Sequence, residues 1–133
     1  MILLDTHAAI WMANVEPMLG KTSRATIVAA RDESELAISA ISFWEIALLV
    51  SKRRLALHDS AAALRNQLLG TGVKELPLTG DIALMAVELK YLHGDPADRF
   101  IVATAIVHYA TLITADANIL KWKHALRRQD AEA

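Results

Sequence analysis

A chain of 133 residues has the length of one domain and is short for two. Its apolar residues (54%) outnumber its charged ones (22%) far enough to build a hydrophobic core, which excludes intrinsic disorder. Fourteen basic and fifteen acidic residues give a formal charge of −1, which excludes a strongly basic surface but not a small basic groove.

The chain contains no cysteine, which excludes disulfides, thiolate metal sites and cysteine nucleophiles. Its start, Met-Ile-Leu-Leu-Asp, lacks the basic region and long apolar stretch of a signal peptide. The most apolar stretch, residues 100–115, is interrupted by polar residues and falls short of the roughly 20 residues of a spanning helix. We expect a cytoplasmic single domain over residues 1–133 with no membrane contact, and a loose tail after about residue 128.

Short apolar runs alternate with helical patterns along the chain. In order, we predict a strand at 1–4, helices at 6–14 and 21–33, a strand at 36–40, helices at 42–54 and 60–69, a strand at 73–76, helices at 81–92 and 96–109, a strand at 112–115, and a short helix at 116–122. A last edge strand at 126–129 remains open. This alternation predicts an α/β fold, with a parallel sheet covered by helices on both faces.

Several helix starts carry recognisable capping residues. Ser42 followed by Glu45 has the spacing of a capping box. Asp95 precedes Pro96, which is the usual order of an N-cap and the first helical position. Asp116 is a plausible N-cap of the short helix that follows the fourth strand.

Carboxylates stand at the points where ligands bind in open α/β folds, beyond the carboxyl ends of the strands. Asp5 follows the first strand, Glu45 lies in the first turn after the second, and Asp116 follows the fourth. Asp98 lies in the first turn of the helix that precedes the fourth strand. Whether that helix start approaches the same edge depends on the strand order, which the sequence alone leaves open.

Each acid also has a simpler explanation, because carboxylates at helix starts contribute roughly 0.3–1 kcal/mol through the helix dipole. Taken singly, Glu45, Asp98 and Asp116 are better explained by capping than by catalysis. Asp5 is the exception, because it ends a buried strand and an unpaired buried carboxylate is costly. We therefore expect a cation beside Asp5.

If the four acids converge, capping no longer explains them together. Like charges at short range raise one another's pKa, and a divalent cation relieves the repulsion. An all-oxygen ligand set selects a hard ion, Mg²⁺ or Mn²⁺. One or two such ions can activate water and hold the leaving oxygen in phosphodiester hydrolysis.

Four segments in this order resemble the PIN-domain ribonucleases, and most closely the VapC-type toxins of type II (VapBC) toxin–antitoxin systems. They are residues 3–7 (LLDTH), 39–46 (SAISFWEI), 94–105 (GDPADRFIVATA) and 112–116 (LITAD). The resemblance covers nearly the whole chain. It implies a PIN-like three-layer α/β/α sandwich around a central parallel sheet of four to five strands. It also implies an endoribonuclease dependent on Mg²⁺ or Mn²⁺, neutralised by a cognate antitoxin and forming a homodimer.

By position in these motifs, the metal-binding and catalytic acids would be Asp5, Glu45, Asp98 and Asp116. The supporting residues would be Thr6, Asp95, Thr114 and Arg99. In these roles Asp95 supports or caps, the two threonines orient carboxylates or waters, and Arg99 contacts either substrate phosphate or a carboxylate.

Two alternatives remain open. The chain could be a catalytically inactive PIN-like module that binds protein or nucleic acid. The basic residues of its last segment form either a phosphate contact or a solvated tail; they are Lys121, Lys123, Arg127 and Arg128. Among the histidines, His7 is better explained by packing on the first helix than by substrate contact, and the other four are expected to be structural or exposed.

Overall fold

The computed structural model describes all residues, 1–133, as five strands and seven helices. The strands are β1 (Ile2–Leu4), β2 (Leu36–Ser39), β3 (Lys74–Leu76), β4 (Thr111–Thr114) and β5 (Arg128–Asp130). The helices are α1 (Thr6–Ala13), α2 (Lys21–Asp32), α3 (Ala40–Ser51), α4 (Ala61–Gly70), α5 (Gly80–Glu88), α6 (Pro96–Val107) and α7 (Ala117–Lys121). None of the helices combines the length and apolar character that crossing a bilayer requires.

The five strands form one parallel sheet in the order β3-β2-β1-β4-β5. The central strand β1 pairs on both sides, with Leu3 opposite Ala37 of β2 and Leu112 of β4. The chain moves outward from β1 to β3, then returns to the other side of β1 for β4 and β5. This order puts the reversal of direction between β1 and β4, which is where open α/β sheets bind ligands.

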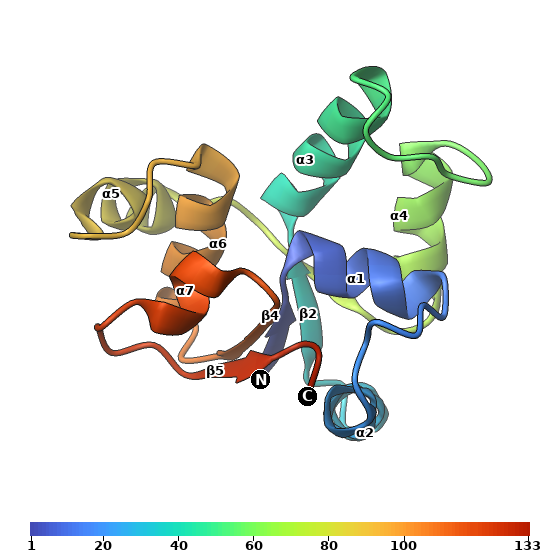
Figure 1. Ribbon diagram of the computed structural model, residues 1–133, viewed down its shortest axis with the longest axis horizontal. Coiled ribbons are helices and arrows are strands. Elements are labelled where there is room, and N and C mark those ends of the chain that lie inside the picture. The colour runs from blue at the N-terminus through green and yellow to red at the C-terminus, as the bar shows by residue number, and fades with distance from the viewer.

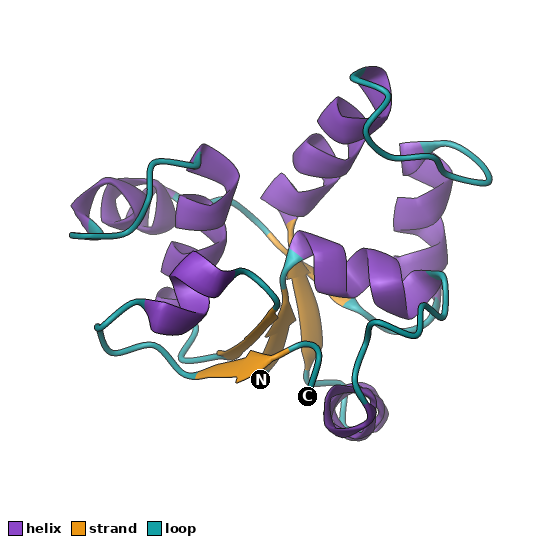
Figure 2. Cartoon of the chain, in the orientation of Figure 1, coloured by secondary structure: helices purple, strands orange, loops and turns teal.

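Helices cover both faces of the sheet, so the predicted three-layer α/β/α architecture is confirmed. Helices α5, α6 and α7 lie on one side of the strands and α1 to α4 on the other (Figures 1 and 2). Alternate residues of β1 serve the two cores: Leu3 packs with the α5–α6 side, and Leu4 with the α1–α4 side. Both side chains are fully buried, as expected for a strand covered on both faces.

The edge strand left open at residues 126–129 is present as β5 at Arg128–Asp130, where the sequence analysis expects a loose tail after about residue 128. β5 pairs with β4, and the following Ala131 is fully buried with its N–H donating to the Thr114 carbonyl. The Ser23 hydroxyl of α2 donates to the Asp130 carbonyl at 2.8 Å. The hydropathy pattern of β5 is weak because this strand is held by backbone and side-chain hydrogen bonds rather than by an apolar face.

Several predicted helix boundaries also differ from the structure, and two of them bear on the site. Helix α3 begins at Ala40, and its N-cap is Ser39, whose side chain accepts from the Ile41 N–H. The predicted capping box of Ser42 and Glu45 is therefore wrong, because both residues lie inside the helix. Helix α5 ends at Glu88 and not near residue 92, since the carbonyls at its end are bound by Arg99.

Candidate metal centre

The four predicted acids line one pocket at the carboxyl edge of the sheet. The pocket measures about 430 Å³, and its polar lining comprises Asp5, His7, Glu45, Asp95, Asp98, Asp116 and Glu132. Helix α6 leads directly into β4, so it runs back along the sheet and its first turn returns to this edge. The strand order thus settles the question left open for Asp98.

Asp5 joins β1 to α1 and is buried. Its Oδ1 accepts from the Thr6 N–H at 2.6 Å, and its Oδ2 accepts from the Thr114 hydroxyl at 2.5 Å. The carboxylate is therefore held in place from β4 as well as from its own helix. No ion pair reaches it, so the cation that the sequence leads us to expect beside Asp5 is not supplied by the protein.

Glu45 lies in the second turn of α3, where it caps nothing. Its helix is tied to α1 by the Thr6 hydroxyl, which donates to the buried Ser42 Oγ at 2.9 Å. One oxygen each of Glu45, Asp95 and Asp98 lie within 4.8 Å of one another. With the capping box absent, the capping explanation for Glu45 no longer applies.

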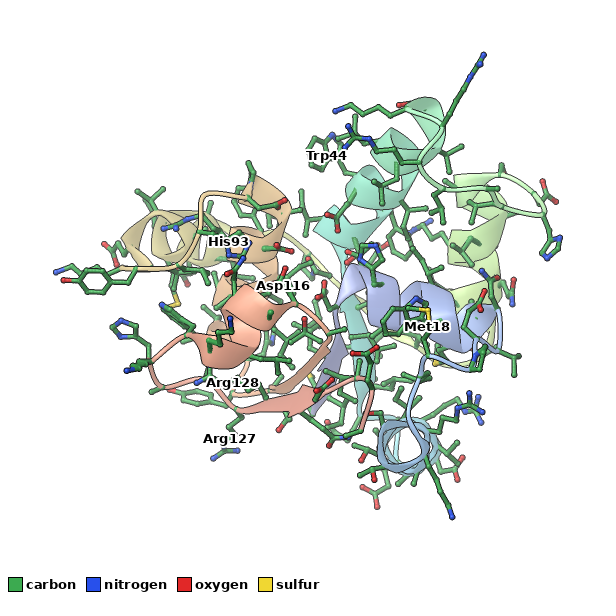
Figure 3. All side chains as sticks on the ribbon, viewed as in Figure 1. Met18, Trp44, His93, Asp116, Arg127 and Arg128 are labelled. Atoms are coloured by element: carbon green, nitrogen blue, oxygen red, sulfur yellow. The ribbon has the colours of Figure 1, made fainter.

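Asp98 bonds to a histidine that the sequence did not single out. Its Oδ2 lies 2.7 Å from Nε2 of His93, and its N–H donates to Oδ1 of the N-cap Asp95 at 3.1 Å. A ring nitrogen of His93 and one oxygen each of Asp98 and Asp116 also lie within 4.8 Å of one another. Figure 3 shows His93 and Asp116 next to each other above α7. Asp98 is therefore shared between the two possible ligand groups of the pocket.

Asp116 combines capping with a place in the pocket. Its Oδ1 accepts from the N–H groups of Asn118 and Ile119 at 2.8 and 3.0 Å, which leaves Oδ2 without a hydrogen bond. The Asp116 N–H donates to the Thr114 hydroxyl at 3.0 Å. Thr114 thus links Asp5 to Asp116 and fixes two of the acids relative to each other.

Burial and mutual repulsion perturb the carboxylates in the direction expected of a cation site. Burial raises the pKa of Asp5, against the hydrogen bonds from Thr114 and Thr6. Burial also raises the pKa of Glu45, and the neighbouring Asp5 and Asp95 add to the effect. For Asp98, burial raises the pKa from 3.8 to about 7, with His93 opposing the rise and the adjacent aspartates contributing to it. A bound cation would stabilise the ionised form of these clustered carboxyl groups, which burial and mutual repulsion disfavour in its absence.

The donor set fits a hard divalent ion. Carboxyl oxygens from Asp5, Glu45, Asp98 and Asp116 face one pocket, and the only basic side chain bonded to any of them is His93, which contacts Asp98. Oxygen ligands with few nitrogens are typical of Mg²⁺ and Mn²⁺ sites, because these ions prefer hard donors. The residues present therefore fit the metal that the sequence analysis expects.

Arg99 turns away from the pocket. Its guanidinium donates to the carbonyls of Ala86, Val87, Leu89 and Leu92 at 2.8–3.2 Å, and to that of His93 at 3.3 Å. It forms no ion pair and no contact suited to substrate phosphate. These bonds cap the end of α5 and fix the loop that carries His93, so the only link from Arg99 to the pocket is through this loop.

Sequence reasoning misses two residues at the site. His93 bonds to Asp98 of the pocket and lies five residues before it on the loop that leads into α6, whereas the sequence analysis expects it to be structural or exposed. Glu132 lines the pocket from the segment after β5. A helix start that carries both Asp95 and Asp98 signals that the loop before it is close to the site. No such signal exists for Glu132, which follows β5, the edge strand that the sequence analysis leaves open.

Comparison with known proteins identifies the family of the chain. Residues 2–124 match the family described as PIN domain. The chain is 37% identical over 124 residues to Ribonuclease VapC22 of Mycobacterium tuberculosis, covering 92% of each protein.

Solved structures agree on the fold. A VapBC2 structure from Rickettsia felis, bound to a promoter DNA fragment, matches with a TM-score of 0.73 and 20% identity, covering 97% of this chain and 98% of that one. DNA-bound VapBC from Salmonella typhimurium matches with a TM-score of 0.72 and 17% identity, covering 97% and 96%. The family match over nearly the full length, together with these likenesses, shows that the chain belongs to the PIN-domain family.

Proposed function

We propose that the chain is a metal-dependent endoribonuclease toxin that acts in the cytoplasm and is neutralised by a cognate antitoxin. The observation that carries the proposal is the convergence of Asp5, Glu45, Asp98 and Asp116 in one pocket at the sheet edge. The 37% identity to a protein named as a ribonuclease supports RNA as the substrate. The structural likeness to VapBC complexes supports the antitoxin.

Asp5, Glu45, Asp98 and Asp116 would hold one or two Mg²⁺ or Mn²⁺ ions. When bound, such ions activate water and offset the charge on the scissile phosphate. Thr114 holds the Asp5 carboxylate by donating to Oδ2. His93 Nε2 lies 2.7 Å from Asp98 Oδ2 and orients this carboxyl group towards the pocket. Asp95 fixes the first turn of α6 through the Asp98 N–H.

RNA cleavage by point variants tests this function. Asp5→Asn and Asp98→Asn are expected to abolish cleavage of a labelled RNA in Mg²⁺ or Mn²⁺, because each replaces a charged ligand with a neutral amide. Asp32→Asn, on the exposed end of α2, is the matched control and should cleave like the parent chain. Circular dichroism checks that all three variants are folded.

Cleavage that persists in both variants, or in excess EDTA, would contradict the proposal. If the parent chain neither cleaves RNA nor binds Mn²⁺ at millimolar concentration, the inactive binding module becomes the better account.

A cleft between α1 and α2 offers a surface for the antitoxin. Its apolar lining includes Trp11, Val15 and Val28, and the last two are exposed. Trp11 lines both this cleft and the acid pocket, so a protein segment seated here abuts the site. Val28→Glu is expected to weaken co-purification with a co-expressed antitoxin and to leave RNA cleavage unchanged. The absence of a small reading frame next to this one would count against an antitoxin.

We also propose a homodimer. Leu84 and Val87 lie exposed on α5 and form an apolar surface without a cover. Burial of such side chains between two copies is favourable at about 25 cal/mol per Å². Light scattering should give twice the monomer mass, and Leu84→Glu should reduce it; a monomeric parent chain at high concentration would refute the dimer.

A further inference from the structure

A second groove adjoins the acid pocket and has the opposite charge. It measures about 570 Å³, within the range of ligand pockets. Its lining comprises Tyr91, Leu92, His93, Asn118, Lys121, Trp122, Lys123 and His124. No carboxylate lines it, and neither lysine forms an ion pair. The groove therefore presents two uncompensated positive charges to a ligand.

Aromatic rings form the other half of this surface. Tyr91 stacks on His124 with ring centroids 6.1 Å apart and planes 10° from parallel. His124 in turn lies 4.7 Å from Trp122, which is buried and donates from Nε1 to the Lys90 carbonyl at 2.8 Å. Despite this stacking, Tyr91 is 91% exposed. The outer face of the Tyr91 ring is therefore open to solvent, while its other face lies against His124, which packs on the buried Trp122.

The backbone presents Tyr91 in an unusual way. Its φ of 65° lies in the left-handed region, where a bulky residue is rare and strained. Four other non-glycine residues share this region, and each follows a helix end with the two hydrogen bonds of a Schellman motif: Val15, Ser34, Arg53 and Tyr109. Tyr91 is not in such a motif. The loop around it is held by Arg99 and by the Trp122 bond to Lys90.

Two hydrogen bonds join the lining of the groove to the acid pocket. His93 lines the groove and bonds to Asp98 in the pocket at 2.7 Å. Asn118 lines the groove, and its N–H donates to Asp116 in the pocket. The groove therefore lies directly beside the candidate metal centre.

We propose that this groove binds the single-stranded RNA that flanks the cleaved phosphodiester, with a base on the open face of Tyr91 and phosphates at Lys121 and Lys123. The proposal rests on the proposed function. A single strand fits because its base faces are free to stack, whereas those of a duplex are covered. Of the other two basic residues near the end of the chain, Arg128 is occupied by the carbonyls of Ile119 and His124. Arg127 lines a separate apolar pocket.

Binding of an unstructured, fluorescently labelled RNA, measured by anisotropy in EDTA, tests the groove. EDTA prevents cleavage and removes phosphate contacts made through a metal. Tyr91→Ala is expected to weaken binding about tenfold, the effect of losing one base stack, while Tyr91→Phe retains it. Tyr109→Ala is the matched control, since Tyr109 is also 81% exposed with a positive φ but precedes β4 at the opposite edge of the sheet.

The double variant Lys121→Ala, Lys123→Ala tests the phosphate contacts. It should make the negative slope of log affinity against log salt shallower by about 1.4, because each phosphate contact of a single strand contributes about 0.7 to its magnitude. The control pair Lys52→Ala, Lys74→Ala removes the same charge from exposed positions outside both pockets and should leave the slope unchanged.

The outcomes separate the two proposals. Wild-type cleavage of RNA, with groove variants that bind and cleave like the parent chain, would overturn the groove alone. Groove-dependent binding by a chain that never cleaves RNA would overturn the nuclease function and retain the surface. Equal binding of a duplex RNA would overturn the stacking role of Tyr91.

Discussion

Replacing Asp98 with asparagine is expected to remove a pH dependence from the stability of the metal-free protein. Burial raises the pKa of Asp98 from 3.8 to about 7. As pH rises above about 4, the unfolded chain releases this proton while the folded chain keeps it. The contribution of Asp98 to stability is therefore present below pH 4 and is lost as pH rises towards 7.

The magnitude follows from the size of the pKa change. At about 1.36 kcal/mol per pKa unit, the full rise corresponds to about 4 kcal/mol, taken as an upper limit. About two pH units of the window lie above pH 5, so the parent chain should lose roughly 2–3 kcal/mol relative to Asp98→Asn between about pH 5 and pH 7.5. Asp5 and Glu45 add to the slope in both proteins, so the difference between the two isolates Asp98.

Urea denaturation in EDTA at the two pH values measures this difference. Asp32→Asn, an exposed residue with the same chemical change, should follow the parent chain. If the parent chain and Asp98→Asn lose stability in parallel, within about 0.5 kcal/mol, the pKa of Asp98 is not raised by burial as described.

Three further predictions concern the residues that hold the site and the fold. Arg99→Lys keeps the charge but loses the planar set of donors, so urea denaturation should show a loss of about 2 kcal/mol or more, and a loss below about 0.5 kcal/mol would refute the capping role. Thr114→Val removes the hydroxyl bonded to Asp5, so Mn²⁺ affinity by calorimetry should fall about 10–100-fold and recover in Thr114→Ser; an unchanged affinity would exclude this positioning role. Gly20→Ala would put a Cβ in collision with the Ala133 carbonyl oxygen, so the free energy of unfolding should fall by about 1–3 kcal/mol. Gly70→Ala, with nothing within 4 Å, should not destabilise, and equal effects of the two changes would contradict the docking of the last residues on α2.

The sequence predicts the layers and the edge of the sheet well, because each depends on local patterns. The apolar runs at β1, β2 and β4 are short and bounded by capping residues, so their ends, and with them Asp5 and Asp116, are easily placed. The sequence analysis correctly puts Glu45 in the helix after the second strand, but the capping box it assigns to Glu45 does not exist. The N-cap of its helix is Ser39, three residues before the N-cap that the Ser42 capping box predicts.

Features that depend on tertiary contacts could not be predicted. Whether Asp98 reaches the pocket depends on the strand order, which no local pattern determines. The pairing of His93 with Asp98 depends on a loop that Arg99 shapes through carbonyls 6–13 residues away. β5 has no apolar stripe of its own and forms because β4 offers it a free edge.

The central claim is that Asp5, Glu45, Asp98 and Asp116 together bind a divalent ion. A crystal soaked in Mn²⁺, with anomalous scattering recorded at the manganese edge, tests it most directly. The account predicts a peak in the pocket among these carboxylates, and its loss in Asp98→Asn. No peak at this edge of the sheet, or manganese bound only elsewhere on the surface, would contradict it.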